Sequence, residues 1–274
     1  MKKITRRSFM AAAGLTVAAL ALTACGGSSS TASSAAASSV ASSAAASSEA
    51  ASAAATELTT VEAGKLTMAT NAAFPPYEMT TDAGEFEGID IETAQAIADK
   101  LGLELQIDDM DFDAALLSVQ QGKADIVMAG VTVTDERKAV MDFSDSYATG
   151  IQSIIVPEGS DIASPDDLAG KKIGTQRGTT GYIYCSDDFG DENVVAYDDG
   201  LTAVQALNNG QVDAVVIDNA PAKEFVAANP GLVILDTSYA EEDYAIGVAK
   251  GSSLKDAVNA ALEELKADGT LQSI

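Results

Sequence analysis

The pattern of hydrophobic and polar positions from residue 65 onward alternates between short apolar runs and segments with helical periodicity. The apolar runs predict buried strands at residues 66–69, 104–107, 124–128, 172–175, 193–197, 214–217 and 233–235. Apolar residues that recur every three or four positions predict helices at residues 91–101, 112–121, 202–208, 220–228 and 254–267. Further helices are expected to begin after Ser164, after Thr134 and within residues 176–181. Strands that alternate with helices in this way predict an α/β fold.

The same local design occurs twice along the chain. Residues 120–127 are QQGKADIV and residues 208–215 are NNGQVDAV, so each has a helix end, a glycine, an aspartate and a buried strand in one order. Two long strands are predicted, at residues 147–156 and 243–249, and residues 142–146 are expected to break the pattern before the first. Two similar units joined by two long strands predict two Rossmann-like lobes with a two-strand hinge and a ligand cleft between the lobes.

The expected domain boundaries follow from this arrangement. Lobe 1 is assigned to residues 58–146 and 245–274, lobe 2 to residues 152–239, and the hinges to residues 147–151 and 240–244.

The first 57 residues are predicted to lie outside the globular part. Residues 1–24 combine a basic start with an apolar run that is too short to span a bilayer, as a signal peptide does. Cys25 follows a Leu-Thr-Ala sequence that resembles a bacterial lipobox, so Cys25 is the expected site of lipidation. The Ser/Ala-rich remainder of residues 25–57 is predicted to be a flexible tether. The protein is therefore expected to be exported and lipid-anchored to the outer face of the cell membrane, by either the general secretory or the twin-arginine route.

Charge and composition exclude several functions. The formal net charge of −25 repels nucleic acid, so no nucleic-acid partner is expected. The chain has no histidine, the usual general base and the commonest metal ligand, and Cys185 is its single cysteine besides Cys25. We expect no cofactor, no metal and no disulfide framework, and we expect the protein to act as a monomer.

The clearest binding chemistry lies in residues 129–138, AGVTVTDERK, directly after a predicted buried strand. Gly130 allows close approach of the backbone, Thr132 offers a hydroxyl group, and Arg137 follows one turn into a helix capped by Thr134. A guanidinium group with nearby hydroxyl and N–H donors binds a small carboxylate well. The alternative is that Arg137 only forms a surface ion pair with a neighbouring aspartate. Asp218 favours the binding interpretation, because it follows the equivalent buried strand of the second unit.

Seven segments, in order, resemble the solute-binding proteins of ABC importers in the polar amino-acid group. They are NAAFPPYE at residues 71–78, GIDIE at 88–92, MDF at 110–112, AGVTVTDER at 129–137, DFSD at 142–145, GTT at 178–180 and VDAVVID at 212–218. The resemblance covers residues 57–274 and implies the type II periplasmic-binding-protein fold. It also implies a non-enzymatic protein that captures a polar L-amino acid by lobe closure and delivers it to an ABC permease in the membrane.

The resemblance further implies which residues bind the ligand. Arg137 is expected to bind the α-carboxylate together with the backbone of Thr132 and of Thr180 at a helix N-terminus. Asp218 is expected to bind the α-ammonium with help from the carbonyl of Gly130. The remaining implied contacts are two aromatic walls, Phe74 and Phe112, and four polar residues near the ligand side chain, Asn71, Gln176, Glu78 and Asp90.

The class of ligand side chain stays open at this point. The amide of Asn71 favours a neutral polar side chain, because relatives that bind cationic amino acids commonly have an acid there. If Glu78 and Asp90 face the pocket, they favour a cationic ligand side chain instead. In the alternative, Asp90 caps the helix that begins at residue 91 and Glu78 is exposed to solvent.

Two alternative functions use the same fold. A dehydratase of the cyclohexadienyl or arogenate type needs an arginine for its substrate carboxylate and an acid as proton donor, for which Glu78 or Asp90 would serve. A ligand-sensing surface domain would use closure for signalling. Asp218 as an amino-group partner favours binding over catalysis, and the sequence shows no output domain for a sensor.

Overall fold

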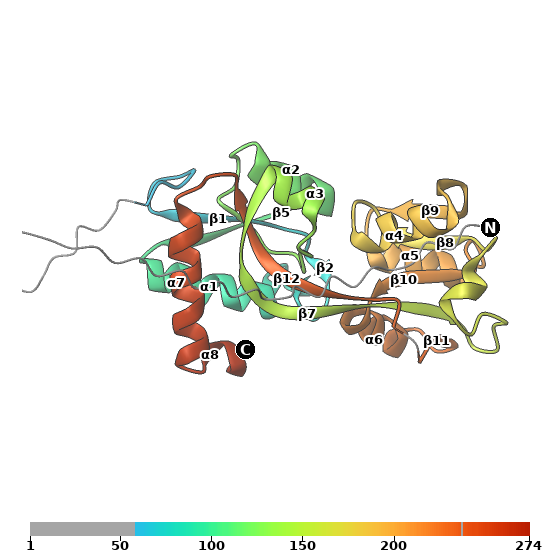
Figure 1. Cartoon of the computed structure of the whole chain (residues 1–274). Helices are drawn as coiled ribbons and strands as arrows, with labels where there is room; N and C mark the ends of the chain where they lie inside the picture. The colour runs from blue at the N-terminus through green and yellow to red at the C-terminus, as the bar shows by residue number, and fades with distance from the viewer. Residues whose placement is uncertain (1–57, 237) are drawn as a thin grey trace, which may run out of the picture. The chain divides into compact units, whose positions relative to one another are not determined.

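The structure is a computed structural model that describes residues 58–236 and 238–274. The predicted signal peptide, the lipidation site Cys25 and the tether lie outside these residues. Within the described part, strands and helices form the expected α/β fold of two lobes (Figure 1).

Nine of the described strands form one large sheet in the order β5-β1-β6-β12-β7-β10-β8-β9, with β11 paired to β7. In lobe 1, β1 (Lys65–Thr70) runs parallel to β5 (Glu104–Asp109) and β6 (Ile126–Val127). In lobe 2, β8 (Ile173–Gln176) runs parallel to β9 (Val194–Tyr197) and β10 (Ala214–Asp218). The small strand β11 is Leu232–Ile234. Each lobe thus has a short parallel sheet, as two Rossmann-like units require.

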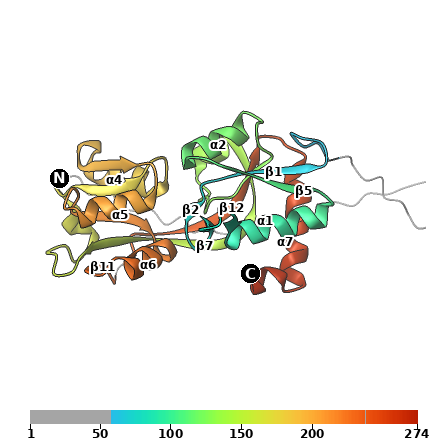
Figure 2. The ribbon, with the colours of Figure 1, turned by 180° about the vertical axis from the view of Figure 1, so that it is seen from behind.

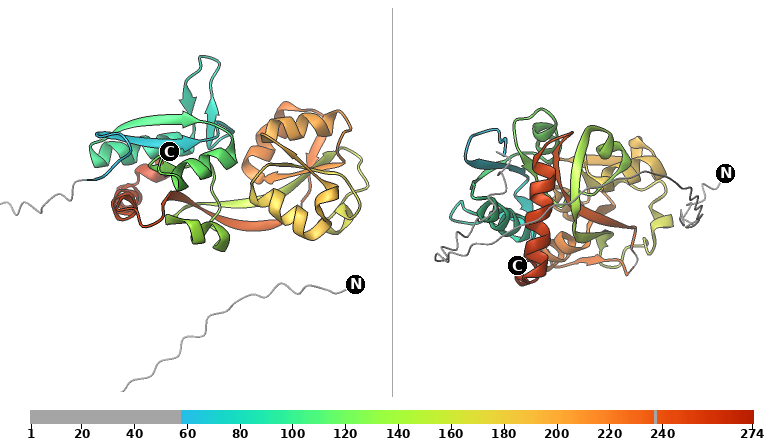
Figure 3. Two further views of the ribbon diagram at one scale, coloured as in Figure 1. Left: turned by 90° about the horizontal axis from the view of Figure 1, so that it is seen from above. Right: turned by 60° about the vertical axis from the view of Figure 1, so that its left-hand side comes forward.

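Two long antiparallel strands join the lobes, β7 (Met141–Pro157) and β12 (Ala240–Ala249) (Figure 3). The expectation that residues 142–146 break the pattern is wrong, because β7 runs through them. There Asp142 pairs with Val248 and Phe143 with Gly247, and the Asp142 carboxylate bonds Lys250 at the strand edge. A half-exposed strand alternates polar and apolar side chains, so polarity alone did not mark its end. The expected hinge segments lie inside β7 and β12, and their limits stay a prediction.

The helices pack against the two halves of the sheet. They are α1 (Ile89–Leu101), α2 (Phe112–Gln120), α3 (Asp135–Val140), α4 (Thr180–Phe189), α5 (Gly200–Asn208), α6 (Asn219–Ala228), α7 (Leu254–Ala267) and α8 (Thr270–Ser273). In lobe 1, α1 and α7 lie side by side, and their apolar faces share one core cluster with β1 and β12 (Figure 2). The expected start at Ser164 gives a single 3₁₀ turn, Pro165–Leu168, because the chain turns at Gly170 (φ 75°) toward β8.

A small three-stranded sheet provides one wall of the ligand-binding pocket described below. It consists of β2 (Ala73–Phe74), β3 (Glu78–Thr80) and β4 (Phe86–Glu87) in that order. The register places Glu78 opposite Phe74, and β4 leads directly into α1.

The repeated sequence pattern has the same structural role in both lobes. Gly122 and Gly210 follow α2 and α5 with φ angles of 66° and 67°, where glycine is favoured. The aspartate three residues after each glycine accepts a backbone N–H near the start of the neighbouring strand. Asp125 accepts the backbone N–H of Thr67 at 2.8 Å, and Asp213 accepts that of Lys172 at 2.8 Å. The two lobes therefore use one local device to align parallel strands.

Gly88 provides a test of how the entrance to α1 is built. Its φ is 124°, and a Cβ there would clash with the carbonyl oxygen of Tyr77. We expect Gly88→Ala to lower the free energy of unfolding by about 3 kcal/mol, because strain and a backbone clash add.

Gly84→Ala is the matched control, since Gly84 has a φ of 79° but open space around a Cβ. It should cost only about 1 kcal/mol from the left-handed backbone alone. Urea denaturation of both variants measures the difference, and equal costs would show that the Tyr77 contact is unimportant.

Candidate ligand-binding site

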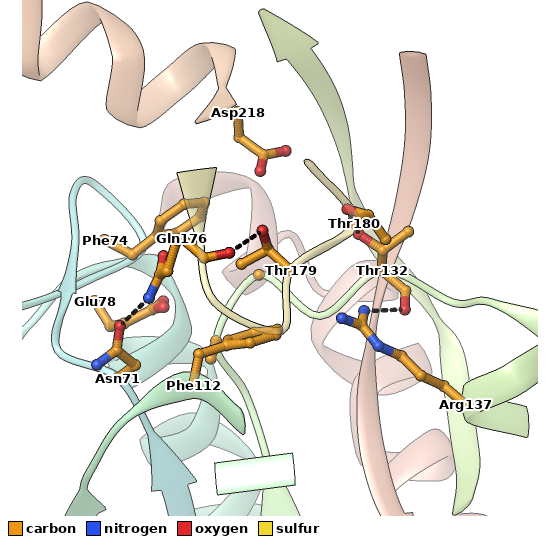
Figure 4. Close-up of a pocket in the computed structure, with 12 residues that line it drawn as sticks. Asn71, Phe74, Glu78, Phe112, Thr132, Arg137, Gln176, Thr179, Thr180 and Asp218 are labelled. Atoms are coloured by element: carbon orange, nitrogen blue, oxygen red, sulfur yellow. Dashed lines mark hydrogen bonds between the residues drawn. The ribbon is translucent and has the colours of Figure 1, made fainter. Parts of the chain in front are cut away.

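A pocket lies where the two lobes meet (Figure 4). Its lining includes all nine residues expected to contact a ligand, together with Glu78. The full lining is Asn71, Phe74, Glu78, Phe112, Ala129, Gly130, Thr132, Arg137, Gln176, Thr179, Thr180 and Asp218. Asp90 does not line it. The pocket is thus built from the ends of β1, β6, β8 and β10, as the carboxyl ends of strands in an open α/β sheet predict.

Arg137 is buried, with 8% of its surface exposed, and its guanidinium is held by backbone carbonyls. Nη1 donates to the carbonyl of Thr132 at 2.7 Å and Nη2 to that of Gly178 at 3.2 Å, so lobe 1 and lobe 2 both hold it. No carboxylate of the described residues forms an ion pair with it, since Asp142 pairs with Lys250 and Asp135 with Lys138. The surface ion-pair alternative is therefore excluded. Burial lowers the pKa of Arg137, which is the effect of a desolvated cation without a direct partner.

The start of α4 adds donors beside Arg137. Thr179 caps this helix by accepting the N–H of Tyr182, and Thr180 is its first residue. The hydroxyl of Thr180 lies 3.4 Å from that of Thr132, so the two residues meet across the cleft. The first N–H groups of a ten-residue helix point out of its end and favour an anion.

Asp218 ends β10 and is the acidic group of the pocket. Its carboxylate accepts the side-chain amide of Gln152 at 2.8 Å and the hydroxyl of Tyr244. Burial raises the pKa of Asp218 to about 7, and the hydrogen bond from Tyr244 partly opposes that rise. A carboxylate in this position lacks a cation and gains strongly from one.

Glu242 is a second buried acid next to this group. Its Oε2 accepts Gln152 at 2.9 Å and the Thr132 hydroxyl at 3.2 Å. Gln152 therefore bridges Asp218 and Glu242, and Thr132 connects the bridge to the Arg137 side of the pocket. Sequence reasoning missed Gln152, Glu242 and Tyr244. The available signal was a glutamine inside the apolar run at residues 147–156, where an isolated polar side chain requires a buried partner.

The other side of the pocket carries the remaining polar groups. Asn71 donates to the carbonyl of Met110 at 2.9 Å and accepts the Gln176 amide at 2.8 Å, so this pair links the lobes. Glu78 is fully buried rather than solvated, which corrects that alternative. Asp90 is also fully buried and does not cap the helix, because Gly88 occupies the cap position of α1. Asp90 instead accepts the N–H of Gly130 at 3.0 Å.

Two aromatic rings form apolar walls. The Arg137 guanidinium lies 5.3 Å from the ring centre of Phe112, within cation–π range. Phe74 packs on Gly130, where a Cβ would come within 2.8 Å of the ring. Both rings also belong to hydrophobic core clusters, so each ring packs in the core and lines the pocket at the same time.

The sequence and the fold are both similar to those of known proteins. Residues 66–274 match the bacterial extracellular solute-binding proteins, family 3. The chain belongs to this family. The L-cystine-binding protein TcyJ of Escherichia coli (strain K12) is 34% identical over 218 residues, which cover 78% of this chain and 82% of that protein.

Two solved structures are similar across the described lobes. An ancestral arginine-binding protein bound to glutamine aligns with a TM-score of 0.74 and 42% identity, covering 77% of this chain and 96% of that chain. An ancestral arginine-binding protein bound to arginine aligns with a TM-score of 0.73 and 43% identity, with the same coverage. The expected type II periplasmic-binding-protein fold is confirmed.

The family places the protein outside the cytoplasm as an amino-acid-binding protein of an ABC transporter, not as an enzyme. Among residues 58–236 and 238–274, no helix is both long enough and apolar enough to cross a membrane.

The raised pKa of Asp218 predicts how stability depends on pH. The folded protein holds this proton more tightly than the unfolded chain does, so the contribution is complete below about pH 4. It is lost as pH rises through about 7, the pKa of the buried group. We therefore expect the free energy of unfolding of the ligand-free protein to fall between pH 4 and pH 8.

Urea denaturation of Asp218→Asn across that range checks this expectation. The variant should lose less stability with rising pH than the parent protein. Asp82→Asn, at an exposed turn, removes the same formal charge and should leave the dependence unchanged. Parallel curves for the parent and Asp218→Asn would contradict the assignment.

Proposed function

We propose that this protein captures a polar L-α-amino acid by closing its two lobes and delivers it to an ABC permease, while a lipid anchor holds it at the outer face of the cell membrane. The observation that carries the proposal is the pair Arg137 and Asp218. Both are 8% exposed, both line one pocket, and they belong to different lobes. Neither has an opposite charge as a direct partner among the described residues.

The chemistry of a zwitterion fits this pair. An α-carboxylate meets the free guanidinium donors of Arg137 and the first N–H groups of α4. An α-ammonium meets Asp218, which Gln152 and Tyr244 already hold in place. Binding would lower the pKa of Asp218 and ionise it, because the ammonium replaces lost solvation.

Closure of the lobes would link ligand capture to delivery. Arg137 of lobe 1 bonds the carbonyl of Gly178 in lobe 2, and Gln176 of lobe 2 bonds Asn71 of lobe 1. An open form separates the two half-sites, so a ligand that touches both favours the closed form. A permease that contacts both lobes then distinguishes loaded from empty protein.

The named ligands of similar proteins support a clamp on the shared part of an amino acid. Cystine, glutamine and arginine differ in their side chains but share the α-carboxylate and the α-ammonium. The dehydratase alternative gains no support, because the family consists of binding proteins.

A panel of amino acids tested by thermal shift checks the clamp. A ligand at 1,000 times its dissociation constant should stabilise the protein by about 4.1 kcal/mol and raise the melting temperature by several degrees. Arg137→Ala should weaken binding by about 3 kcal/mol or more, because it leaves the ligand carboxylate desolvated. Asp218→Ala should have a similar effect through the ammonium.

The exposed Arg177 supplies the control, since it pairs only at the surface with Asp198. Arg177→Ala should leave the thermal shift intact. A panel without any stabilising amino acid, or Arg137→Ala protein that binds as tightly as the parent, would refute the clamp.

Lipid anchoring is tested on the full-length chain. Cys25→Ser should move the exported protein from the membrane fraction to the soluble fraction, because the acceptor thiol is absent. Cys185→Ser controls for the loss of a thiol, since Cys185 is buried in α4. Membrane retention of Cys25→Ser protein would exclude this anchor.

A further inference from the structure

Glu242 is a buried acid that the Arg137–Asp218 clamp does not use. It lies on β12, one of the two strands that join the lobes, and 6% of its surface is exposed. It does not line the ligand pocket but a neighbouring groove, whose lining includes Thr132 and Tyr184. No lysine or arginine of the described residues forms an ion pair with it. A buried acid without an ion-pair partner is costly, so its place beside the pocket requires an explanation.

Gln152 joins Glu242 to the residue that would bind the α-ammonium group. The side-chain nitrogen of Gln152 donates to Asp218 at 2.8 Å and to Glu242 at 2.9 Å. Both hydrogens of this amide are therefore occupied, and neither is free to donate to a ligand. Because an amide group is planar, the position of Glu242 fixes the rotation of the Gln152 amide and with it the hydrogen bond to Asp218. A second hydrogen bond, from the Thr132 hydroxyl at 3.2 Å, holds Glu242 from lobe 1.

The charge of Glu242 acts on both halves of the clamp. Burial lowers the pKa of Arg137, and Glu242 opposes that fall more than any other group does. Burial raises the pKa of Asp218, and the charge of Glu242 adds to that rise. The titratable groups that face Glu242 or Asp218 from the elements packed around them are Tyr77, Glu78, Arg137, Tyr184 and Tyr244.

We propose that Glu242 is a positioning residue of the amino-acid site, which orients Asp218 through Gln152 and adds a second negative charge that tightens binding of the α-ammonium group. The inference rests on the proposed function, because Asp218 must be the partner of that ammonium. Glu242 acts without touching the ligand, since it does not line the pocket and reaches Asp218 only through Gln152.

The negative charge distinguishes this role from a merely structural one. An amide oxygen accepts hydrogen bonds from Gln152 and Thr132 as a carboxylate oxygen does, so Glu242→Gln can keep both contacts. The substitution removes the charge. A residue that only holds the two strands together would therefore tolerate it without a change in ligand affinity.

Calorimetric titration between pH 6 and pH 8 measures the effect of that charge. The probes are L-arginine and L-glutamine, which are bound in the two similar structures. The affinity of the parent protein should rise about tenfold over this range, because an Asp218 with a pKa of about 7 must release its proton at pH 6 but not at pH 8. Should another amino acid of the thermal-shift panel bind instead, it replaces these probes in the same titration.

Glu242→Gln should change both the affinity and its pH dependence. At pH 8, where Asp218 is ionised in both proteins, the variant should bind the ligand about tenfold more weakly, because one of two nearby negative charges is gone. The rise between pH 6 and pH 8 should be smaller than in the parent, since loss of the neighbouring charge lowers the pKa of Asp218. A variant with the affinity and the pH dependence of the parent overturns the positioning role.

Glu241→Gln is the matched control. Glu241 is the preceding residue on β12 and is exposed, so its substitution removes the same formal charge on the same strand. Both the affinity at pH 8 and the rise from pH 6 should stay at the parent values. Contributions from other acids around the pocket are common to the parent and both variants.

Gln152→Met tests the link from its other end should Glu242→Gln fail to fold. The hydrogen bond from Gln152 lowers the pKa of Asp218. Its loss should therefore make the rise in affinity between pH 6 and pH 8 steeper than in the parent. An unchanged rise in Gln152→Met protein overturns the role of the bridge.

The outcomes separate this inference from the proposed function. If Arg137→Ala and Asp218→Ala lose binding while Glu242→Gln behaves as the parent does, the clamp stands and the role of Glu242 is refuted. Binding of no amino acid by the parent protein overturns both.

Discussion

Burial of Arg137 and Asp218 in the same cleft is the constraint on which the rest of the structure depends. Each charge loses solvation and has no opposite charge as a direct partner in the described protein, so the empty pocket is costly. Neutral groups hold both charges at fixed positions instead. Two carbonyls fix the guanidinium, and a glutamine and a tyrosine fix the carboxylate. Under the proposed function, a zwitterionic ligand would recover part of this cost on binding.

The long strands that join the lobes take part in the hydrogen bonds of this site. Gln152 on β7 and Glu242 on β12 lie within the paired strands that join the lobes, and both take part in the hydrogen bonds around Asp218. The strands that join the lobes therefore contact the acidic side of the pocket directly. Thr132 extends the same network to lobe 1 through Glu242. The site and the joint between the lobes are parts of a single polar network.

Much of this arrangement could be predicted from the sequence, because local signals marked it. Buried strands ending in Gly130 and in Asp218 indicated where a cleft would lie, and the repeated helix–glycine–aspartate pattern indicated two units. Other features depended on contacts far apart in the chain. Asp90 is buried where it accepts the N–H of Gly130 and the hydroxyl of Tyr147, which lie 40 and 57 residues later in the chain. The strand through residues 142–146 is likewise fixed by pairing with β12, about 100 residues later.

The chain leaves lobe 1 through β7, builds lobe 2 and returns through β12, so lobe 2 is continuous in sequence and lobe 1 is not. The central strand β12 pairs with β6, and α7 completes the lobe 1 core only afterwards. During synthesis and export, lobe 2 has all its strands and helices before lobe 1 does. The half-site on lobe 1 must wait for the last 35 or so residues of the chain. The core of lobe 1 is therefore closed by residues that follow the whole of lobe 2 in the chain.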